Sequence, residues 1–416
     1  MLAATPTTRC AARTPAATTG VAVRTPAACS RPLVAGGARR VSRKTLCHAV
    51  TSAAVADSPA PPRTTPDWLR RLSLARSPPW ASVQDGSVLS VELGGALPET
   101  APPAGPLSGA PVLSLPAFTE ALRKAAVDPR ITGVYLKVSP LACGWAKLSE
   151  VRRAIALFRA TAPTKFTMAY MELASEREYY IACACEEVYI PESAYVSLRG
   201  LSVSGTFLRG VLEKVGIEPQ IKRIGIYKSA GDQLGRSSMS DAQREVLTSL
   251  LSQIYEEWTT GVAASRGKTV DDVTALLEAP APQLTPTELA AQGWVTGTLY
   301  ADEVKAHLAA RTRGSASEVC SVTVARYMRT RPQKLGLDLG APSVAVIRAS
   351  GAISRGRTST SPLSRGGGGI TNETFIAQLQ RVKKDKRIKA LVLRIDSPGG
   401  DALASGAHGC SCAERR

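Results

Sequence analysis

A lysine follows an apolar, strand-like run in the segment IKRIGIYKSAGD, residues 221–232. At such a boundary the amine of Lys228 is partly removed from water, which favours the neutral form that a general base needs. The chain has only three histidines, His48, His307 and His408, so a catalytic triad or a metal site built on histidine is nearly excluded. Lysine is the obvious substitute base, although Lys228 taken alone also fits an ordinary surface lysine.

Two glycines follow a predicted buried strand in LVLRIDSPGG, residues 391–400. Glycines at the end of a parallel strand let the backbone turn sharply and approach a ligand closely. The N–H groups of Gly399 and Gly400 can therefore form an oxyanion hole. The alternative is a plain turn between this strand and a short helix over 401–405.

A serine stands where a helix is predicted to begin, in MELASEREYYIA at residues 171–182. A helix N-terminus suits a nucleophile and the oxyanion that develops during its attack. Ser175 also fits the N-cap of this helix, because serine is among the preferred residues at that position. We favour the N-cap interpretation.

The elements that would position these residues alternate between strands and helices. The predicted strands are 87–93, 131–138 and 165–170, and the predicted helices are 115–127, 148–159 and 176–184. This alternation is typical of crossover connections, with helices over a mostly parallel sheet. Further along, Ser240 and Gln243 form a capping-box pattern ahead of a predicted helix over 242–264, and residues 293–311 are predicted to form a strand and a helix.

A second strand-and-helix pattern begins at residue 343 and repeats the first. At an offset of 257 residues a 19-residue window contains six identities, which are Phe118/Phe375, Leu122/Leu379, Asp128/Asp385, Arg130/Arg387, Ile131/Ile388 and Leu136/Leu393. The chain is therefore predicted to be a tandem duplication of one α/β unit with an incomplete second copy. An incomplete sheet exposes its edges, so we expect a fragment, an aberrant product or a chain completed by a partner.

Charge is distributed unevenly along the 416 residues. The formal net charge is +18, but residues 1–56 contain eight basic and no acidic residues, so the remainder carries 44 − 34 = +10. This stretch is rich in Ala, Thr, Ser and Pro and lacks a continuous apolar region, which predicts an organelle transit peptide. We expect a plastid transit peptide, and the alternatives are a mitochondrial presequence and an unprocessed tail.

The remaining composition excludes several classes of function. No aromatic-interleaved basic platform or recognition motif accompanies the charge, so no nucleic-acid partner is expected. No run of eighteen apolar residues occurs, so any membrane association is expected to be peripheral. We predict no metal and no cofactor, because the cysteines between the predicted transit peptide and the last seven residues lack metal-ligand spacing: Cys143, Cys183, Cys185 and Cys320. The pair Cys183 and Cys185 fits small buried side chains.

Together these segments resemble the long, duplicated form of the signal peptide peptidase A, or protease IV, family of serine proteases. The most specific pieces are IGIYKSAGD, YYIACACEEVYIPESAYVSLRGLSVSGTF, and GGGGITNETF with DKRIKALVLRIDSPGGDALAS. The resemblance covers residues 86–405 and implies an α/β fold of the Clp protease/crotonase type, with repeated ββα units.

The resemblance also implies a Ser/Lys dyad divided between the two repeats. Lys228 would be the general base, Gly399 and Gly400 would bind the oxyanion, and the serine would come from an Ala-Ser-Gly-Gly turn beyond Gly400. The sequence after Gly400 contains no such turn. In the first repeat Glu176 stands at the position of that serine.

Ser397 and Ser405 belong to the glycine motif and its following helix, and we expect structural roles for both. The predicted organisation is a transit peptide over 1–56, a linker over 57–85, a first peptidase-like repeat over 86–311, a connection over 312–342 and a truncated second repeat over 343–416.

The implied activity is a serine endopeptidase that acts on polypeptides, degrading signal peptides or membrane-derived protein segments in the plastid. It would be peripheral on the thylakoid membrane and a homo-oligomer when full length, and this chain is expected to be inactive alone. The alternative is a non-catalytic subunit or binding module that docks with related protomers. Acyl-CoA chemistry on the related crotonase fold is disfavoured by the motif around Lys228.

Overall fold

The computed structural model describes residues 66–75, 83–99, 112–279, 284–313, 318–337, 343–356 and 369–406. The predicted transit peptide over 1–56 lies outside these residues. Within the predicted linker over 57–85 the structure contains helix α2 (Asp67–Ala75). Leu74 of this helix is buried against Leu335 and Leu337 of the first unit, so apolar packing explains why the segment is ordered here.

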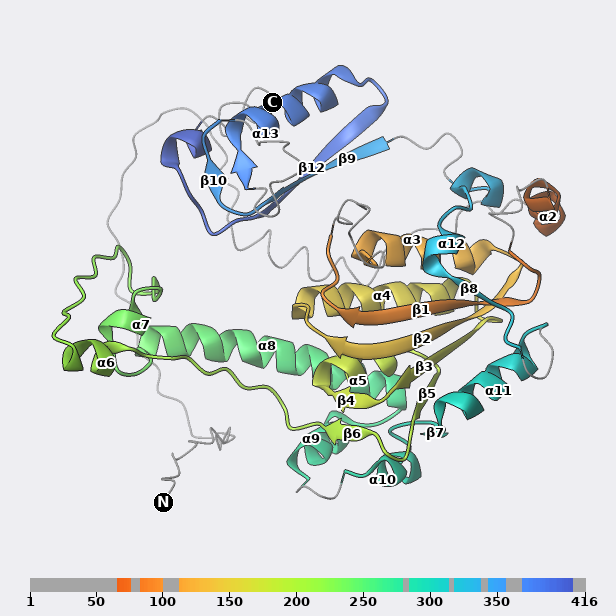
Figure 1. Cartoon of the computed structure of the whole chain (residues 1–416). Helices are drawn as coiled ribbons and strands as arrows, with labels where there is room; N and C mark the ends of the chain where they lie inside the picture. The colour runs from red at the N-terminus through yellow and green to blue at the C-terminus, as the bar shows by residue number, and fades with distance from the viewer. Residues whose placement is uncertain are drawn as a thin grey trace, which may run out of the picture. The chain divides into compact units, whose positions relative to one another are not determined.

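Six parallel strands form the sheet of the first unit, which comprises the described residues from 83 to 337 (Figure 1). Their order across the sheet is β7-β5-β3-β2-β1-β8. The strands are β1 (Ser87–Gly95), β2 (Ile131–Leu141), β3 (Phe166–Met171), β5 (Glu187–Ile190), β7 (Gly297–Thr298) and β8 (Ser321–Thr323). The predicted α/β class with a mostly parallel sheet is confirmed.

Helices cover both faces of this sheet because neighbouring strand residues point to opposite sides. Leu89 of β1 packs in the larger core with α3 (Leu115–Val127), α4 (Trp145–Thr161) and α5 (Glu176–Ala182). Its neighbour Val88 packs in a second cluster with Val304 and Leu308 of α11 (Ala301–Arg311).

The segment between β5 and β7 contains β6 (Tyr195–Ser197) and a series of helices. Strand β6 pairs in parallel with β4 (Leu173–Ser175), which lies earlier in the chain, between β3 and α5. The helices that follow are α6 (Arg209–Lys214), α7 (Asp232–Gly235), α8 (Asp241–Arg266), α9 (Val270–Glu278) and α10 (Pro286–Ala291). The hydroxyl of Ser240 accepts a hydrogen bond from the Gln243 N–H at 3.4 Å, which confirms the predicted start of α8.

Two parts of the first unit differ from the sequence prediction. The stretch predicted to be a connection, 312–342, contains β8, α12 (Val324–Tyr327) and the 3-10 helix η2 (Pro332–Leu335), and β8 pairs with the edge of β1. The apolar run before Lys228 forms no strand in the described residues, and Ile224 is 90% exposed. A strand needs a neighbour to pair with, and residues 221–227 have none here.

The second unit comprises the described residues from 343 to 406. Strand β9 (Ser343–Ser350) pairs in parallel with β12 (Ile388–Asp396), and α13 (Asn372–Lys384) connects them and buries Phe375 and Leu379. Two short strands, β10 (Ile353–Ser354) and β11 (Ile370–Thr371), form a separate parallel pair. The order β9-α13-β12 is the same as β1-α3-β2 in the first unit.

Candidate active site

Lys228 lies on an exposed turn before α7. Gly225 adopts a φ of +95°, which lets the chain turn there, and its carbonyl accepts a hydrogen bond from the Lys228 N–H at 3.4 Å. The Lys228 side chain is exposed, so the prediction that its amine is partly removed from water is wrong for the described residues, because the apolar run before it is not packed against a neighbour. The amine has no hydrogen-bond or ion-pair partner in the part of the chain that the structure describes. The amine is therefore available to a group outside its own turn.

A buried carboxylate closes the loop that carries Lys228. The side chain of Asp232 accepts from Arg223 Nη1 at 2.7 Å on one oxygen and from Ser240 Oγ at 2.8 Å on the other. Arg223 precedes the lysine and Ser240 is the N-cap of α8, so Asp232 ties both ends of the loop to the start of that helix. The carboxylate is buried, which strengthens these bonds relative to an exposed pair.

The segment around Lys228 also exposes many large apolar side chains. Ile224, Ile226 and Tyr227 are 90%, 64% and 55% exposed. Further exposed apolar residues of the same segment are Val203, Leu208, Val211, Val215, Ile217, Ile221, Leu234, Val246 and Leu250. So many such residues within one segment are typical of an interaction surface.

Gly399 and Gly400 lie together on the turn that follows β12. A Cβ at Gly400 would collide with the backbone carbonyl of Ile353, so only glycine fits there. The Gly399 N–H donates to Ser397 Oγ at 3.1 Å, whereas the Gly400 N–H has no acceptor within the described residues. Of the two N–H groups, that of Gly400 is the one free to bind an oxyanion. No hydrogen bond joins this turn to Lys228 in the described ranges.

Ser175 is the N-cap of α5, as the sequence predicts, but its side chain does not bond the helix backbone. Its hydroxyl donates instead to the carboxylate of Glu178. The other oxygen of Glu178 accepts from the Leu141 N–H at 2.6 Å, and Glu178 is buried. The carboxylate of Glu176 accepts from the Arg199 N–H at 2.7 Å.

The Glu178 contact marks a difference between the two units. Ser139-Pro140-Leu141 at the end of β2 matches Ser397-Pro398-Gly399 after β12 at an offset of 258 residues, with two identities. In the first unit the Glu178 carboxylate accepts a hydrogen bond from the Leu141 N–H of this turn. In the second unit the equivalent N–H, that of Gly399, donates to Ser397 Oγ at 3.1 Å. The next N–H also differs: that of Ala142 donates to the Gly95 carbonyl at 2.9 Å, whereas that of Gly400, its match, has no acceptor within the described residues.

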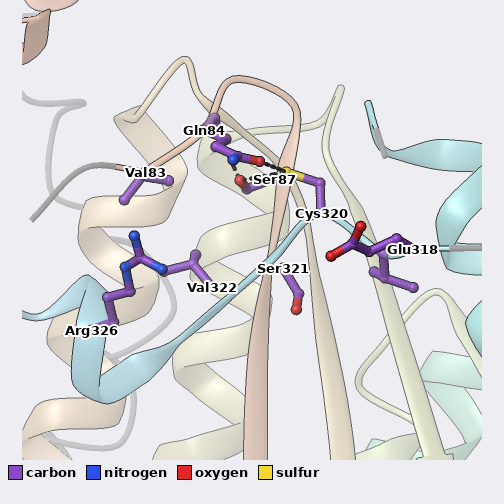
Figure 2. Close-up of a pocket in the computed structure, with 9 residues that line it drawn as sticks. Val83, Gln84, Ser87, Glu318, Cys320, Ser321, Val322 and Arg326 are labelled. Carbon is purple, nitrogen blue, oxygen red and sulfur yellow. Dashed lines mark hydrogen bonds between the residues drawn. The ribbon is translucent and has the colours of Figure 1, made fainter. Parts of the chain in front are cut away.

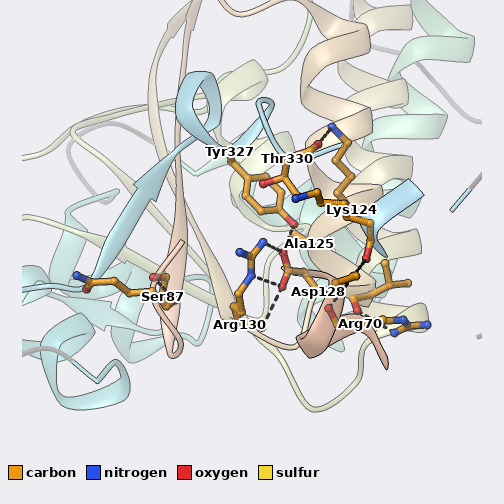
Figure 3. A network of polar contacts seen from close by, with 12 residues as sticks. Arg70, Ser87, Lys124, Ala125, Asp128, Arg130, Tyr327 and Thr330 are labelled. Atoms are coloured by element: carbon orange, nitrogen blue, oxygen red, sulfur yellow. Dashed lines mark hydrogen bonds and ion pairs between the residues drawn. The ribbon is translucent and has the colours of Figure 1, made fainter. Parts of the chain in front are cut away.

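A buried polar network, shown in Figure 3, stabilises the turn between α3 and β2. The sequence analysis did not predict it. Asp128 accepts from Arg130 Nη2 at 2.8 Å and from Tyr327 Oη at 3.1 Å. Burial and the neighbouring Asp128 carboxylate raise the pKa of Tyr327 well above its usual value, so the phenol remains a donor. The Asp128/Arg130 identities with the second unit were the available signal, whereas Tyr327 comes from the stretch predicted to be a connection.

A pocket of about 310 Å³ lies at the amino-terminal ends of β1 and β8 (Figure 2). The thiol of Cys320 lies 3.2 Å from Ser87 Oγ and 3.1 Å from Gln84 Oε1. Ligands in open parallel sheets bind at the carboxyl ends of the strands, so this pocket is on the unfavoured side.

The other cysteines are structural. Cys183 and Cys185 are buried, as predicted, and Cys143 is buried as well. Burial raises the pKa of the Cys185 thiol to about 12. The described residues contain no group of three or more His, Cys, Asp or Glu able to hold a metal ion. Within the same ranges no helix combines the length and apolar character needed to cross a membrane.

Comparison with known proteins identifies relatives of the chain. Residues 160–311 match the model of peptidase family S49. The chain is 43% identical over 328 residues to "Serine protease SPPA, chloroplastic" of Arabidopsis thaliana, covering 79% of this chain and 47% of that protein. It is 27% identical to "Protease 4" of Haemophilus influenzae (68% of this chain, 46% of that protein) and 24% identical to "Protease 4" of Salmonella typhi (69% and 46%). The chain spans about half the length of the curated relatives that it matches.

We predict that Asp232→Ala loosens the loop around Lys228, because Arg223 and Ser240 both lose their acceptor. Limited trypsin digestion followed by mass spectrometry should show several-fold faster cleavage after Lys222, Arg223 and Lys228. Asp241→Ala is the matched control, since this nearby carboxylate is exposed. Equal cleavage rates in the two variants would contradict the role of Asp232.

Glu178→Leu should destabilise the folded chain by about 2 kcal/mol, since it leaves the Leu141 N–H without its acceptor. Glu178→Gln keeps an oxygen for that N–H and should cost clearly less. Urea unfolding of both variants measures the difference. Equal free energies of unfolding would show that the Leu141 contact contributes nothing.

Proposed function

From the membership of this chain in peptidase family S49, which it shares with the SppA proteases, we propose that it provides the base-bearing part of a Ser/Lys endopeptidase. Lys228 is the general base of this proposal. The observation that carries it is the exposed amine of Lys228, which has no partner among the described residues and lies on a segment rich in exposed apolar side chains. An amine with this exposure is accessible to a nucleophile from another unit.

The proposed reaction is acyl transfer through a covalent intermediate. A serine hydroxyl attacks the peptide carbonyl while the neutral Lys228 amine accepts its proton. The Gly400 N–H stabilises the oxyanion of the tetrahedral intermediate. Lys228 then returns the proton to the leaving amine, and water releases the acyl group by the same route.

None of the three serines near these motifs is assigned as the nucleophile. Ser175 donates to Glu178, Ser397 accepts from the Gly399 N–H, and Ser405 donates to the Asp401 carbonyl at 3.0 Å. A serine in an Ala-Ser-Gly-Gly turn, as the family resemblance implies, would complete the dyad. We therefore propose that this chain is inactive alone.

We place the enzyme in the plastid, where it would cleave signal peptides or membrane-derived protein segments. Residues 1–56 with their eight basic and no acidic residues support import, and so does the chloroplastic relative. Peripheral association with the thylakoid membrane and homo-oligomerisation of the full-length protein belong to the same proposal. A mitochondrial location is the alternative.

The two units are proposed to be copies of one ancestral β-α-β element. The Asp385/Arg387 pair supports this: Arg387 Nη2 lies 2.8 Å from Asp385 Oδ2, the same geometry as Arg130 on Asp128. Both pairs stand between a helix and the following parallel strand.

The second candidate function is a non-catalytic module that docks with related protomers. The exposed apolar side chains between residues 203 and 250 favour it, because such a surface is stabilised when a partner covers it. This function is compatible with an inactive chain.

A chimera tests the role of Lys228: this chain followed by the remaining half of its chloroplastic relative. Lys228→Ala should reduce peptidase kcat by about 10²–10⁴-fold, the contribution typical of a general base. Lys222→Ala is the matched control, since Lys222 is an exposed lysine on the same segment. Retained activity in Lys228→Ala would refute the assigned base.

Self-association tests the docking function. Light scattering of the full chain should give a mass above that of a monomer, and the double variant Ile224→Ser, Ile226→Ser should shift it toward the monomer. Leu157→Ser, at an exposed leucine of α4, is the control. A monomer in all three samples argues against docking through this segment.

A further inference from the structure

A dense group of basic residues lies on the turn between α13 and β12. The stretch 381–389, which we call the basic turn, contains six basic residues and one acid, so its formal charge is 6 − 1 = +5. The basic residues are Arg381, Lys383, Lys384, Lys386, Arg387 and Lys389, and all six are exposed. The acid, Asp385, is already paired with Arg387 at 2.8 Å.

The corresponding turn of the first unit has uncharged residues at four of these basic positions. At the offset of 257 residues, Lys383, Lys384, Lys386 and Lys389 correspond to Ala126, Val127, Pro129 and Thr132. The Asp-x-Arg pair is the same in both turns, with Arg Nη2 at 2.8 Å from Asp Oδ2. The backbone form is therefore retained while four side chains change from apolar or neutral to cationic.

The first turn is covered by other parts of the chain, whereas the basic turn is exposed. In the first unit Tyr327 bonds Asp128, Val127 packs against Leu74, and Arg70 Nη1 donates to the Val127 carbonyl at 2.9 Å. A similar cover over the basic turn would bury four ammonium groups, which is strongly unfavourable without counter-charges. None of the four lysines has an ion-pair partner in the described part of the chain.

We propose that the basic turn is a docking surface for an anionic membrane, with the four lysines lying against the lipid headgroups. Clusters of four or more Lys/Arg residues bind anionic lipid surfaces, and each lysine strengthens binding roughly fivefold. Compact ammonium groups without directional hydrogen-bond partners fit such a diffuse negative surface. No aromatic residue occurs between residues 376 and 396, so the stacking platform of single-stranded nucleic-acid binders is missing.

This surface deepens the peripheral membrane location proposed above and is independent of peptidase activity. Lys228→Ala is therefore expected to bind vesicles like the wild type. Loss of activity in that variant and loss of membrane binding in a basic-turn variant are separate results.

Vesicle flotation of the full chain tests the proposal. The chain should bind phosphatidylcholine vesicles that contain about 30% phosphatidylglycerol and not pure phosphatidylcholine, and binding should weaken as salt rises from about 0.05 to about 0.5 M. Changing Lys383, Lys384, Lys386 and Lys389 to Gln should lower the partition coefficient by about 600-fold, which is roughly fivefold for each of the four lysines. Changing the same four to Arg should preserve binding.

The matched control removes four exposed basic charges elsewhere: Arg153, Lys214, Lys305 and Arg329, each changed to Gln. This control variant should retain most of the binding. The basic residues of 1–56 are present in every variant, so their contribution to binding is the same in all of them. Reductive methylation of the wild type with and without vesicles gives a readout that needs no variant, since vesicles should protect the four lysines. Equal binding of the two Gln variants or no protection overturns the proposal, and so does tighter, lysine-dependent binding of duplex DNA or poly(U) RNA.

Discussion

A carboxylate removed from water must accept hydrogen bonds or pair with a cation, and this constraint determines three turns of the chain. Asp128 stabilises the turn between α3 and β2, and Glu178 accepts a hydrogen bond from the Leu141 N–H at the end of β2. Asp232 closes the loop that presents Lys228. The position of the proposed base thus depends on a buried acid that takes no part in the chemistry.

The two units use similar local sequences for different purposes. In the first, Tyr327 covers the Asp-x-Arg turn and Glu178 occupies the N–H of Leu141, so both features serve stability. In the second, the Asp-x-Arg turn carries exposed lysines and the Gly399 N–H, which matches that of Leu141, donates to the nearby Ser397. The N–H of Gly400 beside it has no acceptor within the described residues. Side chains that come from distant parts of the chain make this difference, since Tyr327 lies far from Asp128 in the sequence.

The sequence predicted the elements whose signals are local. Helix α3 occupies the predicted residues, and Ser240 caps α8, because apolar periodicity and capping act within a few residues. Strand β8 was missed because three residues carry little pattern, and pairing with β1 makes them a strand. The run 221–227 has the pattern of a strand but no neighbour. Whether the Lys228 amine is exposed depends likewise on tertiary packing around it, and the local sequence does not predict that packing.

The proposed reaction depends on Lys228 accepting the proton of the attacking serine. The most direct measurement is the rate at which a fluorophosphonate probe labels the serine of the assembled peptidase, because this step isolates nucleophilic attack from product release. If Lys228 is the base, Lys228→Ala slows labelling by about 10²-fold or more, whereas Lys222→Ala leaves it unchanged. Labelling of Lys228→Ala at the wild-type rate would show that another group accepts the proton.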